Sequence, residues 1–371
     1  MKKFMFVFAA VLAAILALSG CGIPGQEKQT DSGSLTIMTW NVHNLFDGKD
    51  DGTEYPEFRQ AAGWSREKYL GRINTISAAI GSLDPQPDII LFQEIENFGI
   101  LKDLTDTMPK RFHWGHFANN PDSAIGLGII SRFPIIEVKA HSIYINGDTI
   151  PRPVLETRIL IDSKDLGGQI EIVIFNNHWK SKIGGVEVTE YVRRAAARVI
   201  VRRIQELQET EPQTGIIVAG DLNLNYDEFS RRDSSVIVSL LPDSPAGAEL
   251  VNLTGEEHLQ RSFQQKDFIV ISGSRPPVPV YFPQRAVVLF SPWIQELENG
   301  SYFYRNNWET IDHFLVSHHF FNGTGWEYER TVVIDFEPFT RSNGQPNSYN
   351  PRTGNGLSDH LPLFLILAAN P

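Results

Sequence analysis

Residues 216–223 read IIVAGDLN, an apolar run that ends abruptly in polar side chains. A continuous run of β-branched and small apolar residues is typical of a strand buried on both faces. Asp221 and Asn223 lie two positions apart, so their side chains point the same way in an extended chain. The stretch predicts a buried strand that delivers two polar side chains to one edge of a sheet.

Five further apolar runs adjoin polar clusters in the same way. The clusters are Trp40-Asn41-Val42-His43, Gln93-Glu94, Asn177-His178-Trp179-Lys180, Asp312-His313 and Ser358-Asp359-His360. Each has a structural explanation when it is taken alone: Asn41 suits a turn, Glu94 a helix cap near Asn97, and His178 a hydrogen-bonded core position. Six such clusters in one chain favour a single functional site along one rim of the sheets.

Strands and a few helices alternate along the chain. Further apolar, β-rich runs are residues 35–40, 88–92, 127–130, 154–161, 170–175, 314–316 and 361–367. Helical periodicity is found at 69–82 and 189–208, whereas the composition of 225–300 and 337–357 predicts long surface loops. This mixture predicts an α/β fold in which two β-sheets stack face to face with helices outside. We expect one domain over residues 35–371.

The first 34 residues have a different character from the rest of the chain. Lys2 and Lys3 precede an apolar run to Leu18 that suits a secretory signal and is too short to span a bilayer. Residues 18–21, Leu-Ser-Gly-Cys, resemble the bacterial lipobox, so we expect a signal peptide at 1–20 and lipidation of Cys21. An ordinary signal peptide is the alternative. We expect residues 21–34 to form a flexible tether. We also expect the protein to be exported and lipid-anchored to the bacterial cell envelope, at the outer membrane or cell surface.

The charge balance limits how the protein can bind polyanions. Cleavage after residue 20 removes Lys2 and Lys3, which leaves 31 basic and 44 acidic side chains and a net charge of −13. Such a surface disfavours non-specific binding to nucleic acid or anionic membrane. It is compatible with a phosphoester enzyme, because clustered carboxylates are the ligands that hard metal ions need.

The ordered set of motifs resembles the endonuclease/exonuclease/phosphatase (DNase-I-like) superfamily. The resemblance covers about residues 35–367 and rests on TWNVHNLFD, LFQEIEN, NNHWKSK, VAGDLNLN, TIDHFLVS and LSDHLPL, with weaker support from GLGIISRFPI and RPVLETRI. It implies a four-layer α/β sandwich, in which two packed, mostly antiparallel β-sheets are flanked by helices. It also implies a divalent-metal-dependent hydrolase of phosphoester bonds with its site at one rim.

The chemistry of phosphodiester cleavage accounts for the residue types. Catalysis needs charge neutralisation, an activated water and a proton for the leaving oxygen. Glu94 is expected to be a metal ligand, with Asn41 and Asp359 beside it. These oxygen donors suit Mg²⁺, Mn²⁺ or Ca²⁺ better than zinc. The resemblance implies that Asp221 and Asn223 contact the attacking water and the phosphate or bind a second metal ion.

His178 and His360 are the expected acid–base pair, because imidazoles can donate or accept protons near neutral pH. The resemblance implies that Asp312 orients His360. The sequence leaves Glu156 and Asp122 open as partners of His178, and it leaves open which histidine is the acid. Arg152, which matches the family's phosphate-contacting arginine, and Lys180 are expected to bind phosphate, with solvated surface charges as the alternative.

The substrate is the least determined property. Exonuclease III relatives carry an aspartate at the position of His43, and inositol 5-phosphatases carry an arginine soon after the GDxN motif, where Asn225 stands here. The NHWKSK motif and the arginine-bearing helix after it resemble secreted bacterial nucleases, so we expect a nuclease that acts outside the cytoplasm. We also expect a monomer. A sphingomyelinase-like lipid phosphodiesterase is the alternative, suggested by the lipid anchor and the aromatic segment 293–308, although that segment is better interpreted as a core strand. A catalytically inactive binding module is disfavoured, because no cluster is broken.

Overall fold

A computed structural model describes residues 33–108, 111–121, 123–231, 238–242, 268–273, 281–282, 286–294 and 296–371. The expected signal peptide, Cys21, most of the tether and Asp122 lie outside these described residues. Among the described helices, none combines the length and the apolar character needed to cross a bilayer.

The first of two large sheets has six strands. Their order is β18 (Gly325–Val333), β19 (Leu363–Asn370), β1 (Ser34–Leu45), β2 (Ile89–Ile95), β4 (Gly126–Ser131) and β3 (Trp114–Ala118). Only β1 and β2 pair in parallel, with Ile37 opposite Ile89, and the other neighbours are antiparallel. Strands β1 and β19 come from opposite ends of the domain and are neighbours within the sheet.

The second sheet has nine strands and is also mixed. Its order is β11 (Leu240–Pro242), β12 (Ile269–Ser272), β14 (Ala286–Phe290), β17 (Asp312–Val316), β10 (Gly215–Asp221), β9 (Gly168–His178), β8 (Val154–Ser163) and β5 (Ile135–His141), and β13 (Tyr281–Phe282) pairs with β14. The central strands β9 and β10 run parallel, which places His178 directly opposite Asp221 at their carboxyl ends.

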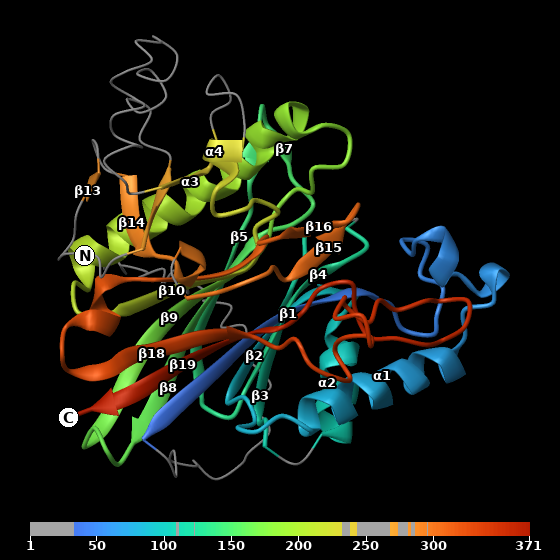
Figure 1. Cartoon of the computed structure of the whole chain (residues 1–371), viewed down its shortest axis with the longest axis horizontal. Helices are drawn as coiled ribbons and strands as arrows, with labels where there is room; N and C mark the ends of the chain where they lie inside the picture. Colours follow the sequence, from blue (N-terminus) through green and yellow to red (C-terminus); the bar gives the residue numbers. More distant parts are fainter. Residues whose placement is uncertain are drawn as a thin grey trace, which may run out of the picture.

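Figure 1 shows helices on the outer faces of the two sheets, which gives four layers. Three hydrophobic cores lie between these layers. Helices α1 (Arg66–Gly81) and α2 (Phe98–Thr107) pack on the outer face of the first sheet, and α3 (Val186–Thr210) packs on that of the second. Leu35 and Ile37 of β1 enter the core between the sheets, whereas Met38 and Trp40 enter the core under the helices. A strand that is buried on both faces has a continuous apolar run in its sequence, as observed for these strands. The predicted four-layer α/β sandwich is confirmed.

Polar side chains join the two sheets beneath the rim. The Gln93 side-chain nitrogen donates to Asn176 Oδ1 at 2.7 Å, and Asn176 Nδ2 donates to the backbone oxygens of Phe92 and Gly128 at 3.2 and 3.0 Å. Buried amides need such partners, so these bonds favour one alignment of the sheets. Gln93, expected to be part of a site cluster, therefore lies in the core.

Two sequence interpretations need correction. Residues 225–300 are not only surface loops, because β11, β12 and β14 extend the second sheet and bury residues such as Ile269 and Leu289. The segment 293–308 is not a core strand. Trp293 is buried in a 3₁₀ turn (Pro292–Ile294), and the chain then forms a partly exposed hairpin of β15 (Tyr302–Tyr304) and β16 (Asn307–Glu309). The composition of both regions does not indicate which short segments pair with a neighbouring strand.

Candidate active site

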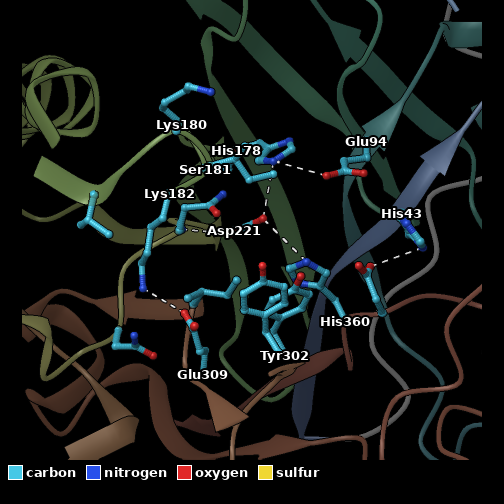
Figure 2. Close-up of a pocket in the computed structure, with 18 of the residues that line it drawn as sticks. His43, Glu94, His178, Lys180, Ser181, Lys182, Asp221, Tyr302, Glu309 and His360 are labelled. Carbon is cyan, nitrogen blue, oxygen red and sulfur yellow. Dashed lines mark hydrogen bonds and ion pairs between the residues drawn. The ribbon is translucent and has the colours of Figure 1, made fainter. Parts of the chain in front are cut away.

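The predicted polar clusters meet at one rim of the two sheets, as expected from the strand order. They border a cleft of about 1300 Å³. Figure 2 shows seven of the residues in its walls, which are His43, Glu94, His178, Lys180, Asp221, Tyr302 and His360. Arg152, Asn223 and Asp359 also line it. Asn41 and Asp312 are buried close beneath it and hydrogen-bond to side chains of the cleft. The structure therefore brings together residues as far apart in the sequence as Asn41 and His360.

Irregular backbone aims these side chains into the cleft. The pairing of β1 with β2 shifts register between Asn41 and Leu45, and the pairing of β2 with β4 shifts between Gln93 and Ile95. Glu94 has a φ of 63°, and His43 and Asn44 each have a φ of 57°. Bulges redirect side chains, and positive φ in residues other than glycine is costly and often found at functional sites.

Gly220 permits the close approach of β9 and β10 at the rim. Its φ is 116°, and a Cβ atom at this position would lie 2.1 Å from the backbone oxygen of Asn177. A side chain here would push apart the two strands that carry His178 and Asp221. The glycine of the GDxN motif is thus required by packing.

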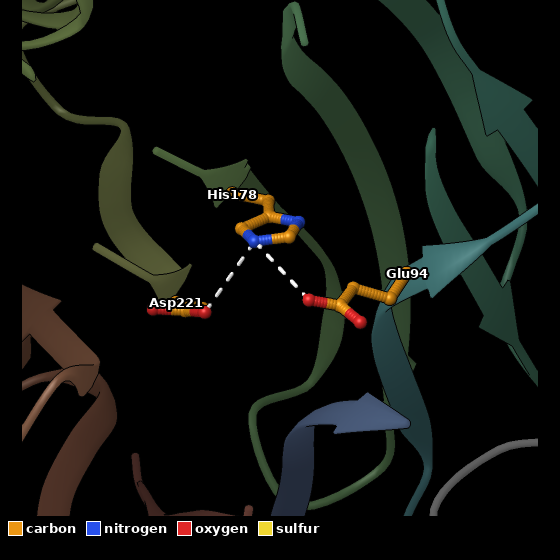
Figure 3. A group of neighbouring side chains, drawn as sticks. All are labelled: Glu94, His178 and Asp221. Atoms are coloured by element: carbon orange, nitrogen blue, oxygen red, sulfur yellow. Dashed lines mark ion pairs between the residues drawn. The ribbon is translucent and has the colours of Figure 1, made fainter. Parts of the chain in front are cut away.

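Glu94, His178 and Asp221 form a compact group (Figure 3). The Nε2 atom of His178 lies 3.5 Å from Glu94 Oε1 and 3.5 Å from Asp221 Oδ2. Asn41 Nδ2 donates to the same two carboxylate oxygens at 3.1 and 3.0 Å, and the Oδ1 atom of Asn41 accepts from the His43 backbone N–H. Asn41 therefore holds the two carboxylates in place through its amide nitrogen.

His360 belongs to a second chain of hydrogen bonds. Its Nδ1 is 2.8 Å from Asp312 Oδ2, which also accepts from the Ser301 hydroxyl at 2.6 Å. Its Nε2 lies 4.0 Å from Asp221 Oδ2, on the cleft side. The structure thus places Asp312 where the family resemblance implied, behind His360, and Asp221 between the two histidines.

The two histidines have opposite electrostatic surroundings. Burial lowers the pKa of His178 well below its ordinary value, and the charges of Arg152, His360 and Lys180 lower it further. Burial also disfavours the charged form of His360, but the carboxylates of Asp312, Asp221 and Asp359 outweigh it and raise the pKa of His360 well above the ordinary value. At neutral pH, His178 is therefore neutral and His360 is protonated.

The pKa of Asp221 is also raised. The pKa of Asp221 is about 7, mainly because the carboxyl group is buried. The charge of His360 lowers this pKa, whereas the charges of Asp312 and Glu94 raise it. A carboxyl group that titrates near neutral pH can both accept and release a proton under ordinary conditions. Such a group at the centre of the cleft suits proton transfer.

The chemistry of the donor set fits a divalent cation. One ligand atom from each of Glu94, His178 and Asp221 lies within 4.8 Å of the others, and two of the three are carboxylate oxygens. Carboxylates suit Mg²⁺ and Mn²⁺, while the imidazole nitrogen adds a donor that the sequence analysis had not counted. Asp359, the other expected ligand, is instead 3.5 Å from His43 Nδ1.

The remaining predicted residues lie around the cleft. The Asn223 side chain donates to the backbone oxygen of Trp179 at 3.1 Å, and Arg152 donates to the same oxygen at 3.0 Å. Lys180 is exposed, and its pKa is lowered by partial burial and by the charges of Arg152 and Arg193. Arg152 and Lys180 therefore bring two positive charges to one wall.

One candidate named from the sequence is not supported by this geometry. Glu156 pairs with His141 at 2.6 Å and with Arg203 at 2.8 Å, so it is not the partner of His178. Sequence could not show this, because the partners come from β5 and α3.

Lys182, a neighbour of the predicted phosphate contact, is held by Glu228 at 2.8 Å and Glu309 at 2.9 Å (Figure 2). Its charge is neutralised within the cleft wall, and it is not free to bind phosphate.

Sequence reasoning missed Ser301 and Tyr302. The ring of Tyr302 packs 4.6 Å from the ring of His360, and Ser301 is the second hydrogen-bond donor to Asp312. The aromatic alternation of Tyr302 and Tyr304 was the one available signal, whereas nothing in the sequence distinguishes Ser301 from an ordinary turn residue.

Comparison with known proteins identifies the family. A sequence model described as the Endonuclease/Exonuclease/phosphatase family matches residues 36–260, more than half of the chain. No curated protein matches the sequence significantly. Among solved structures, truncated TDP2 from Caenorhabditis elegans matches with a TM-score of 0.51 at 15% identity, over 91% of this chain and 98% of that chain.

A mannosyl-6-phosphatase from Bacteroides thetaiotaomicron matches with a TM-score of 0.49 at 18% identity, over 90% of this chain and 99% of that chain. At 15% identity, the likeness to TDP2 shows a shared fold alone. The sequence match over residues 36–260 shows that the chain belongs to the endonuclease/exonuclease/phosphatase family, whose members are hydrolases of phosphoester bonds that generally depend on a divalent metal.

Proposed function

We propose that this protein is a divalent-metal-dependent phosphodiesterase, and specifically a nuclease that acts outside the cytoplasm. The observation that carries the proposal is the position of Asp221, which lies 3.5 Å from His178 Nε2 and 4.0 Å from His360 Nε2, within a group that suits a cation. Nucleophile activation and phosphate binding can thus occur within one group of neighbouring side chains. All of these side chains come from one chain, which supports action as a monomer.

Glu94, Asp221 and His178 are the residues that would hold the ion, with Mg²⁺ or Mn²⁺ as the expected species. When bound, the ion would neutralise charge on the phosphate. Asn41 keeps both carboxylates in position, and Asn223, Arg152 and Lys180 would position the phosphate from the facing wall.

The opposite protonation states of the histidines assign their roles. His360, kept protonated by Asp312, would donate a proton through Nε2 to a phosphoryl or leaving oxygen. Asp221, which lies between the two histidines, would accept the proton of the attacking water. Neutral His178 would accept a hydrogen bond or bind the ion through Nε2.

Aromatic side chains beside the cleft support nucleic acid as the substrate. The rings of Tyr302 and Tyr304 lie 6.1 Å apart and nearly parallel, and the Arg305 guanidinium lies 5.1 Å from the Tyr304 ring centre. Stacked tyrosines with a neighbouring arginine can bind bases without sequence preference. Trp293 is buried, so the aromatic segment offers less apolar surface to a membrane than its composition suggested.

A lipid phosphodiesterase is the second candidate. Ile183 lines the cleft, and Val188 and Tyr191 follow it in the first turns of α3. All three are exposed, with 82%, 70% and 55% of their surface accessible. Exposed apolar residues beside a catalytic cleft suit insertion into a lipid interface.

One assay separates the candidates. The purified protein with Mg²⁺ should degrade linear DNA and leave sphingomyelin vesicles intact, and a His360→Ala variant serves as the inactive control. Choline-phosphate release without DNA cleavage would support the lipid enzyme instead. Absence of turnover on both substrates and on a chromogenic phosphodiester would favour an inactive binding module.

We also propose that Cys21 carries a lipid that anchors the protein to the bacterial cell envelope, with residues 21–34 as the tether. The support is the resemblance of residues 18–21 to the lipobox. Cys21→Ser should yield an exported protein that takes up no labelled fatty acid and leaves the membrane fraction. Membrane association equal to that of the wild type would contradict the lipid anchor.

A further inference from the structure

Three carboxylates outside the cleft lie unusually close together. Asp51, Glu54 and Glu96 each place a carboxylate oxygen within 4.8 Å of the others. Glu54 is 1% exposed and Glu96 is 8% exposed, while Asp51 lies at the surface. None of the three borders the cleft that contains Glu94.

The positive charge near this group is insufficient to balance it. Within the described residues, no lysine or arginine forms an ion pair with Asp51, Glu54 or Glu96. Lys49 pairs with the neighbouring Asp47 at 3.3 Å, and Arg59 donates to the backbone oxygen of Glu54. Burying unpaired carboxylates is costly, so a compensating cation is expected.

Glu96 provides an independent sign of a missing ligand. Its Oε2 atom accepts from the backbone N–H of Asp47 at 2.7 Å, but its Oε1 atom is buried without any hydrogen-bond partner. A buried charged oxygen is rarely left without a partner, and an unplaced ion is one of the few explanations.

We propose that Asp51, Glu54 and Glu96 bind one Ca²⁺ ion at a site separate from the catalytic cleft. The three oxygens are close enough together to bind the same ion. A set of carboxylate ligands without nitrogen or sulfur is the kind that Ca²⁺ takes in proteins.

The ion would fix the segment that forms one wall of the cleft. Glu54 accepts hydrogen bonds from the backbone N–H groups of Asp51 and Gly52, and Tyr55 and Glu57 directly after it line the cleft. Glu96 belongs to the junction between β2 and α2. Calcium would therefore connect this junction to residues 51–57 and stabilise the wall that faces substrate.

The test uses the full chain with Glu94→Gln, which removes a carboxylate ligand from the cleft, so that calcium binding reports the second site. Calorimetry should find about one Ca²⁺ per chain. Asp51→Asn should weaken its binding about tenfold or more, because one charged ligand is lost. Asp50→Asn is the matched control, with the same charge change in the same segment, and should alter affinity less than about twofold.

Thermal unfolding provides the second measurement. Saturating Ca²⁺ should raise Tm by about 5 °C. Glu96→Gln should abolish this rise, yet in chelator its Tm should equal or exceed that of the parent, because an uncompensated buried charge is removed. No Ca²⁺ binding, or equal effects of Asp50→Asn and Asp51→Asn, would overturn the proposal. A Glu96→Gln protein that is destabilised equally with and without Ca²⁺ would overturn it as well.

Discussion

Replacing Asp312 with asparagine isolates the charge that keeps His360 protonated. The two side chains are buried, their polar atoms are 2.8 Å apart, and Ser301 can still donate to the substituted amide oxygen. Shape and one hydrogen bond are therefore retained while the negative charge is lost. Two other carboxylates, Asp221 and Asp359, still raise the pKa of His360 in the variant. Burial lowers this pKa, and without the charge of Asp312 the remaining carboxylates offset the effect of burial less fully.

The magnitude follows from the separation of the charges. Two unit charges about 4 Å apart interact by about 4 kcal/mol at an effective dielectric constant of 20, which corresponds to about a thousandfold in rate. We therefore expect Asp312→Asn to lower kcat by about 10² to 10⁴ at pH 8, in the range of a general acid.

The pH dependence has a definite sign. In the wild type the pKa of His360 is raised, so the active, protonated form persists to high pH and activity falls only as pH rises through that pKa. In the variant the pKa falls, so the alkaline limb should move to lower pH. Along that limb the deficit should shrink by about tenfold for each pH unit as pH decreases.

The assay is a kcat–pH profile on a chromogenic phosphodiester with saturating metal ion, and circular dichroism verifies the fold. Ser301→Ala is the matched control, because it removes the other hydrogen bond to Asp312 and keeps the charge. It should lower kcat by less than about tenfold. An alkaline limb at the same pH in Asp312→Asn and wild type would refute the assignment of His360 as the charged donor.

Three further predictions follow from the cleft. Activity should require added Mg²⁺, Mn²⁺ or Ca²⁺ and be lost in EDTA; full turnover in chelator would rule out the metal site. Asp221→Asn should lower kcat by about 10² to 10⁴ and yet raise stability at pH 8. The pKa of Asp221 is raised from 3.8 to about 7 in the folded protein. Ionisation of Asp221 therefore lowers the free energy of unfolding of the wild type by a few kcal/mol as the pH rises between these values. Thermal unfolding of wild type and variant at pH 4 and pH 8 measures this difference. Lys180→Ala should raise KM for DNA, and this increase should shrink as the salt concentration rises. Lys182→Ala should change KM much less, because Glu228 and Glu309 already neutralise Lys182. Equal, salt-dependent increases in KM for the two variants would contradict this pairing.

The fold was largely predictable because its signals are local. Continuous apolar runs such as residues 216–219 identified the buried strands, and amphipathic periodicity identified α1 and α3 to within a few residues of their ends. Strands β3, β5, β11, β12, β14 and β18 were not predicted, and each depends on a neighbouring strand for its hydrogen bonds. Local composition cannot reveal such pairing.

The sequence by itself determined which residues gather at the rim, because a side chain at the end of a buried strand has little choice of direction. It named Glu94, His178, Asp221 and His360, which lie far apart in the chain and within one cleft in the structure. Tertiary structure alone decided how each of them behaves. The protonation of His360, the neutrality of His178 and the neutralisation of Lys182 depend on charges brought within about 4 Å by strand pairing and sheet packing, and electrostatic interactions depend on distance in space rather than on separation along the chain.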